Sequence, residues 1–250
     1  YTTLTVVALY GNYMLIVMGV QTLMTAMFNS MNAGIGNLVA EGDKRKIMSV
    51  FAELFSIRFL FSCIMCFGVL MITPAFVSFW IGKKYVMDSL SLLLMTAILF
   101  VNLSRTTVDA YINAYGLFCD IWAPIVEASL NVGLSIILGY YFGLHGVLSG
   151  VLISLLLVVF CWKPYYLFRK GLDERLSIYI FMYARHLMAA LLCGVIVCLG
   201  MRYSMVQGDT TFFDGLLGIL VFSILSTLTL LCVAPGMRNL MRRFIRMCHV

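Results

Sequence analysis

Three apolar segments of membrane length each carry a row of polar side chains at helical spacing. The rows are Gln21, Thr25, Asn29 and Asn32, then Asn102, Arg105, Asp109 and Asn113, then Glu127, Asn131 and Ser135. Steps of three or four residues keep each row on one face of a helix. Such a face cannot point at lipid, because ionised groups in hydrocarbon cost several kcal/mol each. We therefore predict a polar interior, and the favoured use of such an interior is passage of a polar substrate.

Six charged residues lie inside the apolar segments, and counting residues from the segment ends predicts that all six occupy the same half of the membrane. They are Glu53, Arg58, Arg105, Asp109, Glu127 and Arg185. Arg105 and Asp109 are four residues apart and can form an ion pair within one helix. Two interpretations are open, a self-neutralised structural pair or a pair that lines a substrate pathway. The asparagines before and after the pair favour the second.

The remaining intramembrane charges suggest different roles. Glu127 has no partner in its own row, so it is bridged to Arg58 or Arg105, or it is protonated. We take Glu53 and Glu127 as candidates for coupling transport to H⁺ or Na⁺. Arg185 either snorkels toward lipid headgroups or contacts a lipid phosphate.

The composition indicates that the apolar segments lie in a lipid environment. Hydrophobic residues make up 62% of the 250 residues and charged residues only 11%, against about 25% charged in a soluble domain. We predict an all-α polytopic membrane protein with about seven full transmembrane helices. The first residues are interpreted as the remnant of an earlier helix, closed by a turn at Tyr10-Gly-Asn-Tyr13, so we expect a fragment of a longer protein. The predicted spans are residues 12–40, 47–72, 89–116, 121–142, 146–168, 176–201 and 213–233.

The loop charges predict the orientation. One side of the membrane receives eleven basic residues: Lys44, Arg45, Lys46, Lys163, Arg169, Lys170, Arg175, Arg238, Arg242, Arg243 and Arg246. The other side receives Lys83, Lys84 and Arg202. The positive-inside rule makes the first side cytoplasmic. The C-terminal tail, with arginines between apolar residues, is interpreted either as an interfacial helix on anionic lipids or as a topological anchor.

Other classes of function find little support in the sequence. Cys63-x-x-Cys66 lies in hydrocarbon-like surroundings, so we expect buried thiols rather than a disulfide or a metal site. With three histidines and no Gly-x-Ser-x-Gly element or phosphate loop, we expect no enzyme, no catalytic residue, no metal and no cofactor. Nucleic acid is not an expected partner, because the basic residues lie in short loops beside the spans.

Several sequence motifs resemble polysaccharide flippases, the Wzx-like O-antigen and capsule-repeat exporters of the multidrug/oligosaccharidyl-lipid/polysaccharide exporter superfamily. The resemblance covers residues 1–170. It is carried by Tyr10-Gly-Asn-Tyr13, the stretch from Ala33-Gly-Ile-Gly to Glu41-Gly-Asp43, Phe79-Trp-Ile-Gly82, Asn113-Ala-Tyr-Gly116, Asn131-Val-Gly-Leu-Ser135 and Gly143-Leu-His-Gly-Val147, with Gly150 and Ile153-Ser154 after it.

The resemblance implies the C-terminal part of a two-lobe transporter. Residues 1–170 would be the end of helix 7 through helix 12, residues 171–233 helices 13 and 14, and residues 234–250 a basic cytoplasmic tail. The family moves an undecaprenyl-diphosphate-linked oligosaccharide across the bacterial inner membrane by alternating access. The predicted cavity residues are Arg58, Arg105, Asp109, Asn102, Asn113, Gln21, Asn29, Asn32 and Asn131. By the resemblance, Arg58, Arg105 and Arg185 would be the candidates for holding the diphosphate, and Arg185 would lie at a groove for the lipid.

This sequence departs from a strongly cationic cavity, because Glu53, Asp109 and Glu127 balance the three intramembrane arginines. Either an absent lobe supplies the excess positive charge, or the carboxylates serve ion coupling. The alternatives are a cation-coupled drug or metabolite antiporter, a membrane-embedded glycan polymerase or acyltransferase, and a structural or receptor-like membrane protein. The two enzymes would need a large polar loop or a His-centred site.

Overall fold

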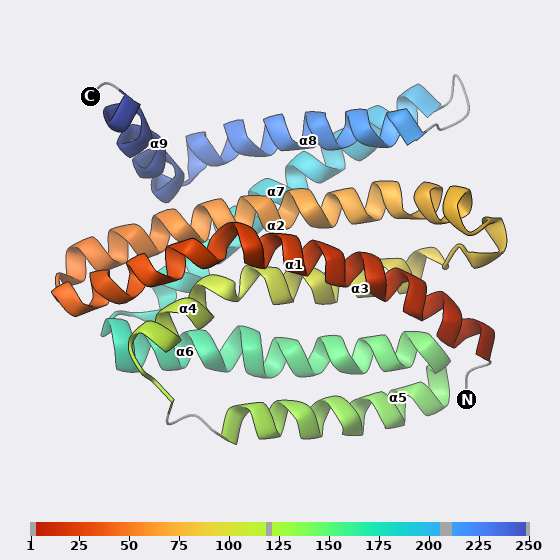
Figure 1. The fold of residues 1–250 in the computed structure, drawn as a ribbon, viewed down its shortest axis with the longest axis horizontal. Helices are drawn as coiled ribbons and strands as arrows, with labels where there is room; N and C mark the ends of the chain where they lie inside the picture. Colours follow the sequence, from red (N-terminus) through yellow and green to blue (C-terminus); the bar gives the residue numbers. More distant parts are fainter. Residues whose placement is uncertain (1–3, 119–121, 206–211, 249–250) are drawn as a thin grey trace.

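The computed structural model describes residues 4–118, 122–205 and 212–248, and within these residues all regular structure is helical. Figure 1 shows the long helices side by side along one axis. The predicted connections at 116–120 and 202–214, and the first three residues of the predicted remnant helix, lie partly or wholly outside the described ranges. The prediction of an all-α, multi-pass membrane protein is confirmed.

The helices follow one another with short connections. They are α1 (Leu4–Glu41), α2 (Lys44–Trp80), η1 (Lys83–Tyr85), α3 (Ser89–Ser104), α4 (Thr106–Ala114), α5 (Trp122–Leu155), η2 (Leu156–Trp162), α6 (Lys163–Leu167), η3 (Phe168–Leu172), α7 (Leu176–Met205), α8 (Phe212–Val233) and α9 (Pro235–Cys248). Helix α3 continues into α4 through Arg105, and η2 and η3 are π-helical stretches.

Six helical runs of the described chain are long and apolar enough to cross a membrane. The longest, Trp122–Leu172, contains Gly143 at φ 58° and ψ −133°, where the chain reverses direction. This run, named the α5 hairpin, therefore has a first leg (122–142) and a return leg (144–172), visible at the bottom of Figure 1. Counting both legs gives the seven crossings that the hydropathy pattern predicts.

Glycines let the two legs of the α5 hairpin approach closely. A Cβ atom built on Gly146 would lie 1.9 Å from the carbonyl oxygen of Leu138, and one on Gly150 would lie 2.6 Å from the backbone nitrogen of Ser135. The Ser135 hydroxyl donates to the carbonyl of Val147 at 3.3 Å. Small residues at such a crossing allow van der Waals contact between backbones, which drives helix association in lipid.

Substituting Gly146 with alanine is therefore expected to push the legs of the α5 hairpin apart. Overpacking of this kind costs about 1–3 kcal/mol, measurable as a lower thermal unfolding temperature of the purified protein in detergent. Gly133→Ala is the matched control, because a Cβ atom there meets nothing within 4 Å. Equal stability of the Gly146 and Gly133 variants would contradict the close-contact account.

The turn between α1 and α2 is built from two residues. Gly42 adopts φ 76°, which favours glycine, and Asp43 caps α2 by accepting the backbone N–H groups of Arg45 and Lys46 at 3.0 and 3.2 Å. This turn, the end of α4, α6 and α9 lie at one end of the bundle, on the left in Figure 1. We name it the basic end, because it carries most of the loop lysines and arginines.

The turn expected at Tyr10-Gly-Asn-Tyr13 is absent, since α1 runs unbroken from Leu4 to Glu41. A glycine inside a helix costs only about 1 kcal/mol. Tyr13 is 2% exposed, and its hydroxyl accepts the backbone N–H of Met87 at 3.0 Å. Burial of this ring outweighs the glycine penalty, so residues 4–10, which were interpreted as the remnant of an earlier helix, belong to α1.

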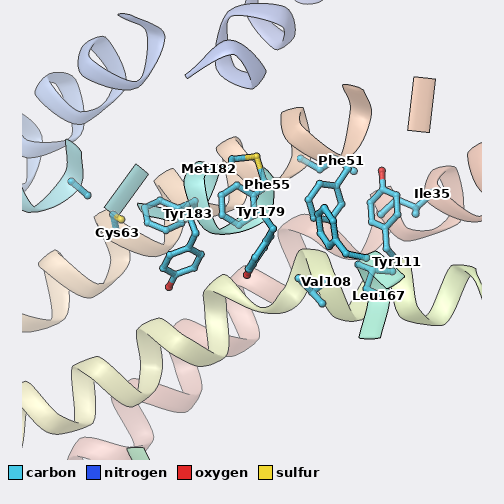
Figure 2. Close-up of a cluster of buried hydrophobic side chains, with 14 of the residues drawn as sticks. Ile35, Phe51, Phe55, Cys63, Val108, Tyr111, Leu167, Tyr179, Met182 and Tyr183 are labelled. Atoms are coloured by element: carbon cyan, nitrogen blue, oxygen red, sulfur yellow. The ribbon is translucent and has the colours of Figure 1, made fainter. Parts of the chain in front are cut away.

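Helix α2 lies at the centre of the bundle and contacts α1, α3, α4, α7, α8 and α9. Its aromatic residues form a buried cluster with rings from α4, η3 and α7 (Figure 2). Phe51 meets Tyr111 edge to face at 5.1 Å between ring centroids, and Phe55 meets Tyr179 at 5.7 Å. Such pairs add about 0.5–1.5 kcal/mol each beyond area burial, so this cluster fixes how α4 and α7 sit against α2.

At the end of the bundle opposite the basic end, Asp88 joins the start of α3 to the tip of the α5 hairpin. Its Oδ2 lies 2.7 Å from His145 Nε2 and accepts the backbone N–H of Ser91 at 3.0 Å. Partial burial works to raise the pKa of Asp88, but the hydrogen bonds from His145 and Ser91 outweigh it and lower the pKa to about 2.

Acidification is expected to weaken this link in a defined window. The folded-state pKa of Asp88 lies below the ordinary value of about 3.9, so between these values the unfolded chain binds more protons. The stabilisation is present above about pH 4 and is lost as the pH falls toward 2. Thermal unfolding of the protein in detergent should show this loss, and Asp88→Asn should reduce it. An unchanged acid profile in the variant would assign the loss to other carboxyl groups.

Candidate functional site

A polar cavity of about 520 Å³ lies between α1, α2 and the α3–α4 span. It is lined by Gln21, Met24, Thr25, Phe28, Asn29, Asn32, Arg58, Asn102, Leu103, Arg105, Thr106, Asp109, Ala110 and Asn113. The first two polar rows thus face each other across one space, together with a guanidinium from α2. Eight of the nine predicted cavity residues line it, all except Asn131.

The third polar row does not reach the polar cavity. Asn131 lies on the first leg of the α5 hairpin, where its side-chain oxygen accepts the hydroxyl of Ser135 at 3.2 Å. Glu127 lies on the same leg, and no ion pair or hydrogen bond joins it to another described residue. The expected bridge from Glu127 to Arg58 or Arg105 is therefore absent, since both arginines hold other partners.

Arg58 is the most deeply placed cation of the cavity, with 2% of the residue exposed. Its Nη1 donates to the carbonyl of Thr106 at 2.9 Å, and its Nη2 donates to Asn32 Oδ1 at 3.1 Å. The Phe28 ring lies 5.3 Å from the guanidinium carbon. Within the described chain no carboxylate pairs with Arg58, and its buried Nε has no hydrogen-bond partner. A buried cation held only by neutral acceptors favours binding of an anion beside it.

Arg105 and Asp109 form the ion pair that their spacing predicts. Arg105 Nε lies 3.3 Å from Asp109 Oδ2, and both side chains are close to one-third exposed. The other oxygen of the same carboxylate, Asp109 Oδ1, accepts the ammonium of Lys163 at 2.9 Å. Asp109 therefore serves two cations, one on its own helix and one from the return leg of the α5 hairpin.

Lys163 is the residue that the sequence analysis missed here. It was counted among the cytoplasmic loop charges, although the span predicted over 146–168 already contained it. That position inside a span was the available signal, because a lysine at membrane depth needs a partner. The partner lies 54 residues away in the sequence, so helical spacing could not identify it.

Glu53 lies outside the polar cavity and joins α2 to the C-terminal helix. The residue is 3% exposed, and its Oε1 lies 3.2 Å from Arg243 Nη2 of α9. Nearby, a Cβ atom on Gly236 would lie 2.3 Å from the carbonyl oxygen of Ala52, so α9 rests directly on α2. Farther along α9, an exposed face carries Met241, Phe244 and Ile245 beside arginines. The interfacial interpretation of the tail stays a prediction for that exposed face only.

Removing one member of the Glu53–Arg243 pair is expected to leave a buried charge with a poor partner. Arg243→Gln should lower the free energy of unfolding by about 1–3 kcal/mol, measured by denaturation in detergent. The double variant Glu53→Gln/Arg243→Gln should recover most of this loss, because no unpaired carboxylate remains. Additive losses in the double variant would show that the two side chains do not interact.

Arg185 lies on α7, away from the polar cavity. Its guanidinium is 5.7 Å from the Phe181 ring, its Nε has no partner, and the charge of Arg238 on α9 opposes it. The contact of Arg185 with a lipid phosphate stays a prediction. The six charges considered in the sequence analysis, Glu53, Arg58, Arg105, Asp109, Glu127 and Arg185, lie in the half of their spans nearer the basic end, as residue counting predicts.

The balance of charge expected from the sequence is wrong at the cavity. Glu53 is turned toward α9 and Glu127 is on the α5 hairpin, so neither offsets the cavity arginines. The cavity surface carries Arg58 and Arg105 against Asp109, and Lys163 contacts the same carboxylate from behind. The site is therefore net positive, with four asparagines and a glutamine around the charges.

No group of three or more His, Cys, Asp and Glu side chains that could hold a metal ion occurs within residues 4–118, 122–205 and 212–248. Cys63 and Cys66 are buried as free thiols. The chain matches no family model, no curated protein and no solved structure. The residues of the polar cavity indicate its chemistry: its arginines can bind an anion, and its amide side chains can form hydrogen bonds with hydroxyl groups.

Proposed function

We propose that this protein is a flippase that moves an undecaprenyl-diphosphate-linked oligosaccharide repeat unit across a bacterial inner membrane by alternating access, for surface polysaccharide synthesis. The polar cavity would hold the charged and sugar-bearing part of the substrate. Arg58 and Arg105 would contact the diphosphate, since guanidinium groups suit phosphate oxygens. The amides of Gln21, Asn29 and Asn102, with the other cavity amides, would contact sugar hydroxyls.

The observation that carries this proposal is the state of Arg58. A guanidinium that is buried at membrane depth, lacks a carboxylate partner and faces a cavity is costly unless an anion visits it. The sequence motifs that resemble polysaccharide flippases support the same substrate class. A cationic drug is a poorer candidate, because it would meet two arginines and one already paired carboxylate.

The orientation proposed from the loop charges is consistent with this use. If the basic end is cytoplasmic, the polar cavity lies in the cytoplasmic half of the membrane, where a lipid-linked precursor is made available. Several cavity residues of α1, among them Thr25, Asn29 and Asn32, are exposed on the described chain. Such groups need cover by protein or water at this depth, which supports one wall of a two-lobe transporter.

Loss of the Arg105 charge is expected to reduce export strongly. In a strain that lacks its own flippase and is complemented by the whole protein, Arg105→Gln should lower surface polysaccharide about tenfold or more, because the diphosphate loses a direct cationic partner. Export is measured as surface polysaccharide per cell, with lipid-linked precursor quantified in parallel. The precursor should accumulate as the polysaccharide falls.

Arg45→Gln is the matched control for this test, because Arg45 is an exposed arginine at the start of α2, outside the cavity. Membrane levels of both variants are measured by immunoblot. Normal export by Arg105→Gln and by Arg58→Gln at normal protein levels would rule out the polar cavity as the substrate site. Failure of the wild-type protein to complement strains with several glycans would favour the antiporter instead.

A further inference from the structure

We propose that Asp109 is a built-in competitor for the anion site, which occupies Arg105 when the polar cavity is empty and yields it when an anionic substrate binds. This inference rests on the proposed function, because it assumes that the cavity takes an anion. It assigns to Asp109 the control of substrate affinity and release, in place of the coupling roles expected for Glu53 and Glu127.

The geometry of the Asp109 carboxylate suits this role. Asp109 divides its oxygens between two cations: Oδ2 faces Arg105 Nε at 3.3 Å, and Oδ1 faces Lys163 Nζ at 2.9 Å. The longer contact is the one on the cavity side. An incoming phosphate can therefore take Arg105 while Asp109 keeps Lys163, so that no carboxylate is left unpaired at membrane depth.

Arg58 differs from Arg105 in the kind of partner that holds it. The Arg58 guanidinium already holds fixed neutral partners, the carbonyl of Thr106 and the amide oxygen of Asn32. Its charge is permanently available to the cavity. Arg105 differs because an acid on its own helix neutralises it, so its availability depends on whether Asp109 is engaged. One arginine thus attracts the anion at all times, and the other joins only when the carboxylate gives way.

Lys163 belongs to a different part of the fold, the return leg of the α5 hairpin. It begins α6, directly after the π-helical stretch Leu156–Trp162 in the return leg of the α5 hairpin. Such stretches are frequent at functional sites. Movement of this leg would shift the ammonium relative to Asp109 and change how strongly the carboxylate competes for Arg105. Asp109 therefore links occupancy of the polar cavity to the position of the α5 hairpin.

The inference predicts an unusual sign: removing an acidic residue should tighten binding. The probe is farnesyl diphosphate, farnesol is the uncharged reference, and binding is measured by calorimetry on the whole protein in detergent. Asp109→Asn should bind farnesyl diphosphate about three- to tenfold more tightly than the wild type, because Arg105 becomes free. The same variant should export more slowly, because the anion is no longer displaced. Asp173→Asn removes an exposed carboxylate at the basic end and should leave the affinity unchanged.

Lys163→Met provides an independent test with the opposite sign. Without the ammonium, Asp109 has only Arg105 as a partner and competes harder, so binding of farnesyl diphosphate should weaken severalfold. In the Asp109→Asn background the same substitution should have a clearly smaller effect. Such non-additivity identifies an interaction through the carboxylate rather than a general loss of positive charge.

The outcomes separate this inference from the proposed function. If the wild type binds farnesyl diphosphate and Asp109→Asn binds it equally or more weakly, the competitor role of Asp109 is wrong, while the proposed anion cavity stands. If the wild type, Asp109→Asn and Asp109→Ser all fail to bind farnesyl diphosphate, both the competitor role and the proposed anion cavity are wrong. If Asp109→Asn does not fold, Asp109→Ser replaces it in the binding measurement. A second comparison is between Arg105→Gln and Arg105→Gln/Asp109→Asn, where no gain in affinity for farnesyl diphosphate is expected because Arg105 is absent from both.

Discussion

The guanidinium of Arg58 is the group on which the arrangement of this bundle depends. It lies inside α2, donates to a carbonyl of the α3–α4 span and to an amide of α1, and has no carboxylate partner within the described chain. In a low-dielectric surrounding, each of these donors must be satisfied or it costs free energy. The three helices are therefore held around one cation, and the space that remains between them becomes the polar cavity.

The need to compensate a buried charge also explains the partners of other intramembrane residues. Glu53 is almost fully buried and is compensated by Arg243, which ties the amphipathic helix α9 to α2. Asp109 is compensated twice, by Arg105 and Lys163. Glu53 and Asp109 are thus engaged in ion pairs and Glu127 lies on the α5 hairpin outside the cavity, while Arg58 lines the cavity without a carboxylate partner in the described chain. The cavity becomes electropositive through this unequal pairing, and not through a surplus of basic residues in the spans.

Helical periodicity predicted a large part of this site because the constraint is local within each helix. The rows of Gln21, Asn29 and Asn32 and of Asn102, Arg105 and Asn113 could face only protein or water, and they do face one cavity. Periodicity cannot say which helices meet. The row of Glu127 and Asn131 obeys the same spacing but lies on the first leg of the α5 hairpin, outside the cavity. The pairs Glu53–Arg243 and Asp109–Lys163 join segments far apart in the sequence, so helical periodicity could not predict them either.

Two glycines show where this residue type is informative: Gly11, in the turn wrongly expected at residues 10–13, and Gly143, between the predicted spans 121–142 and 146–168. Gly11 has helical geometry and nothing near it, so it leaves α1 intact. Gly143 has a positive φ, and the glycines after it allow the legs of the α5 hairpin to touch. That close contact fixes the return leg along the first one, and the return leg carries Lys163 to Asp109. The ion pair of Arg105 with Asp109 therefore depends on backbone packing near the end of the bundle opposite the basic end, away from the charged residues of the cavity.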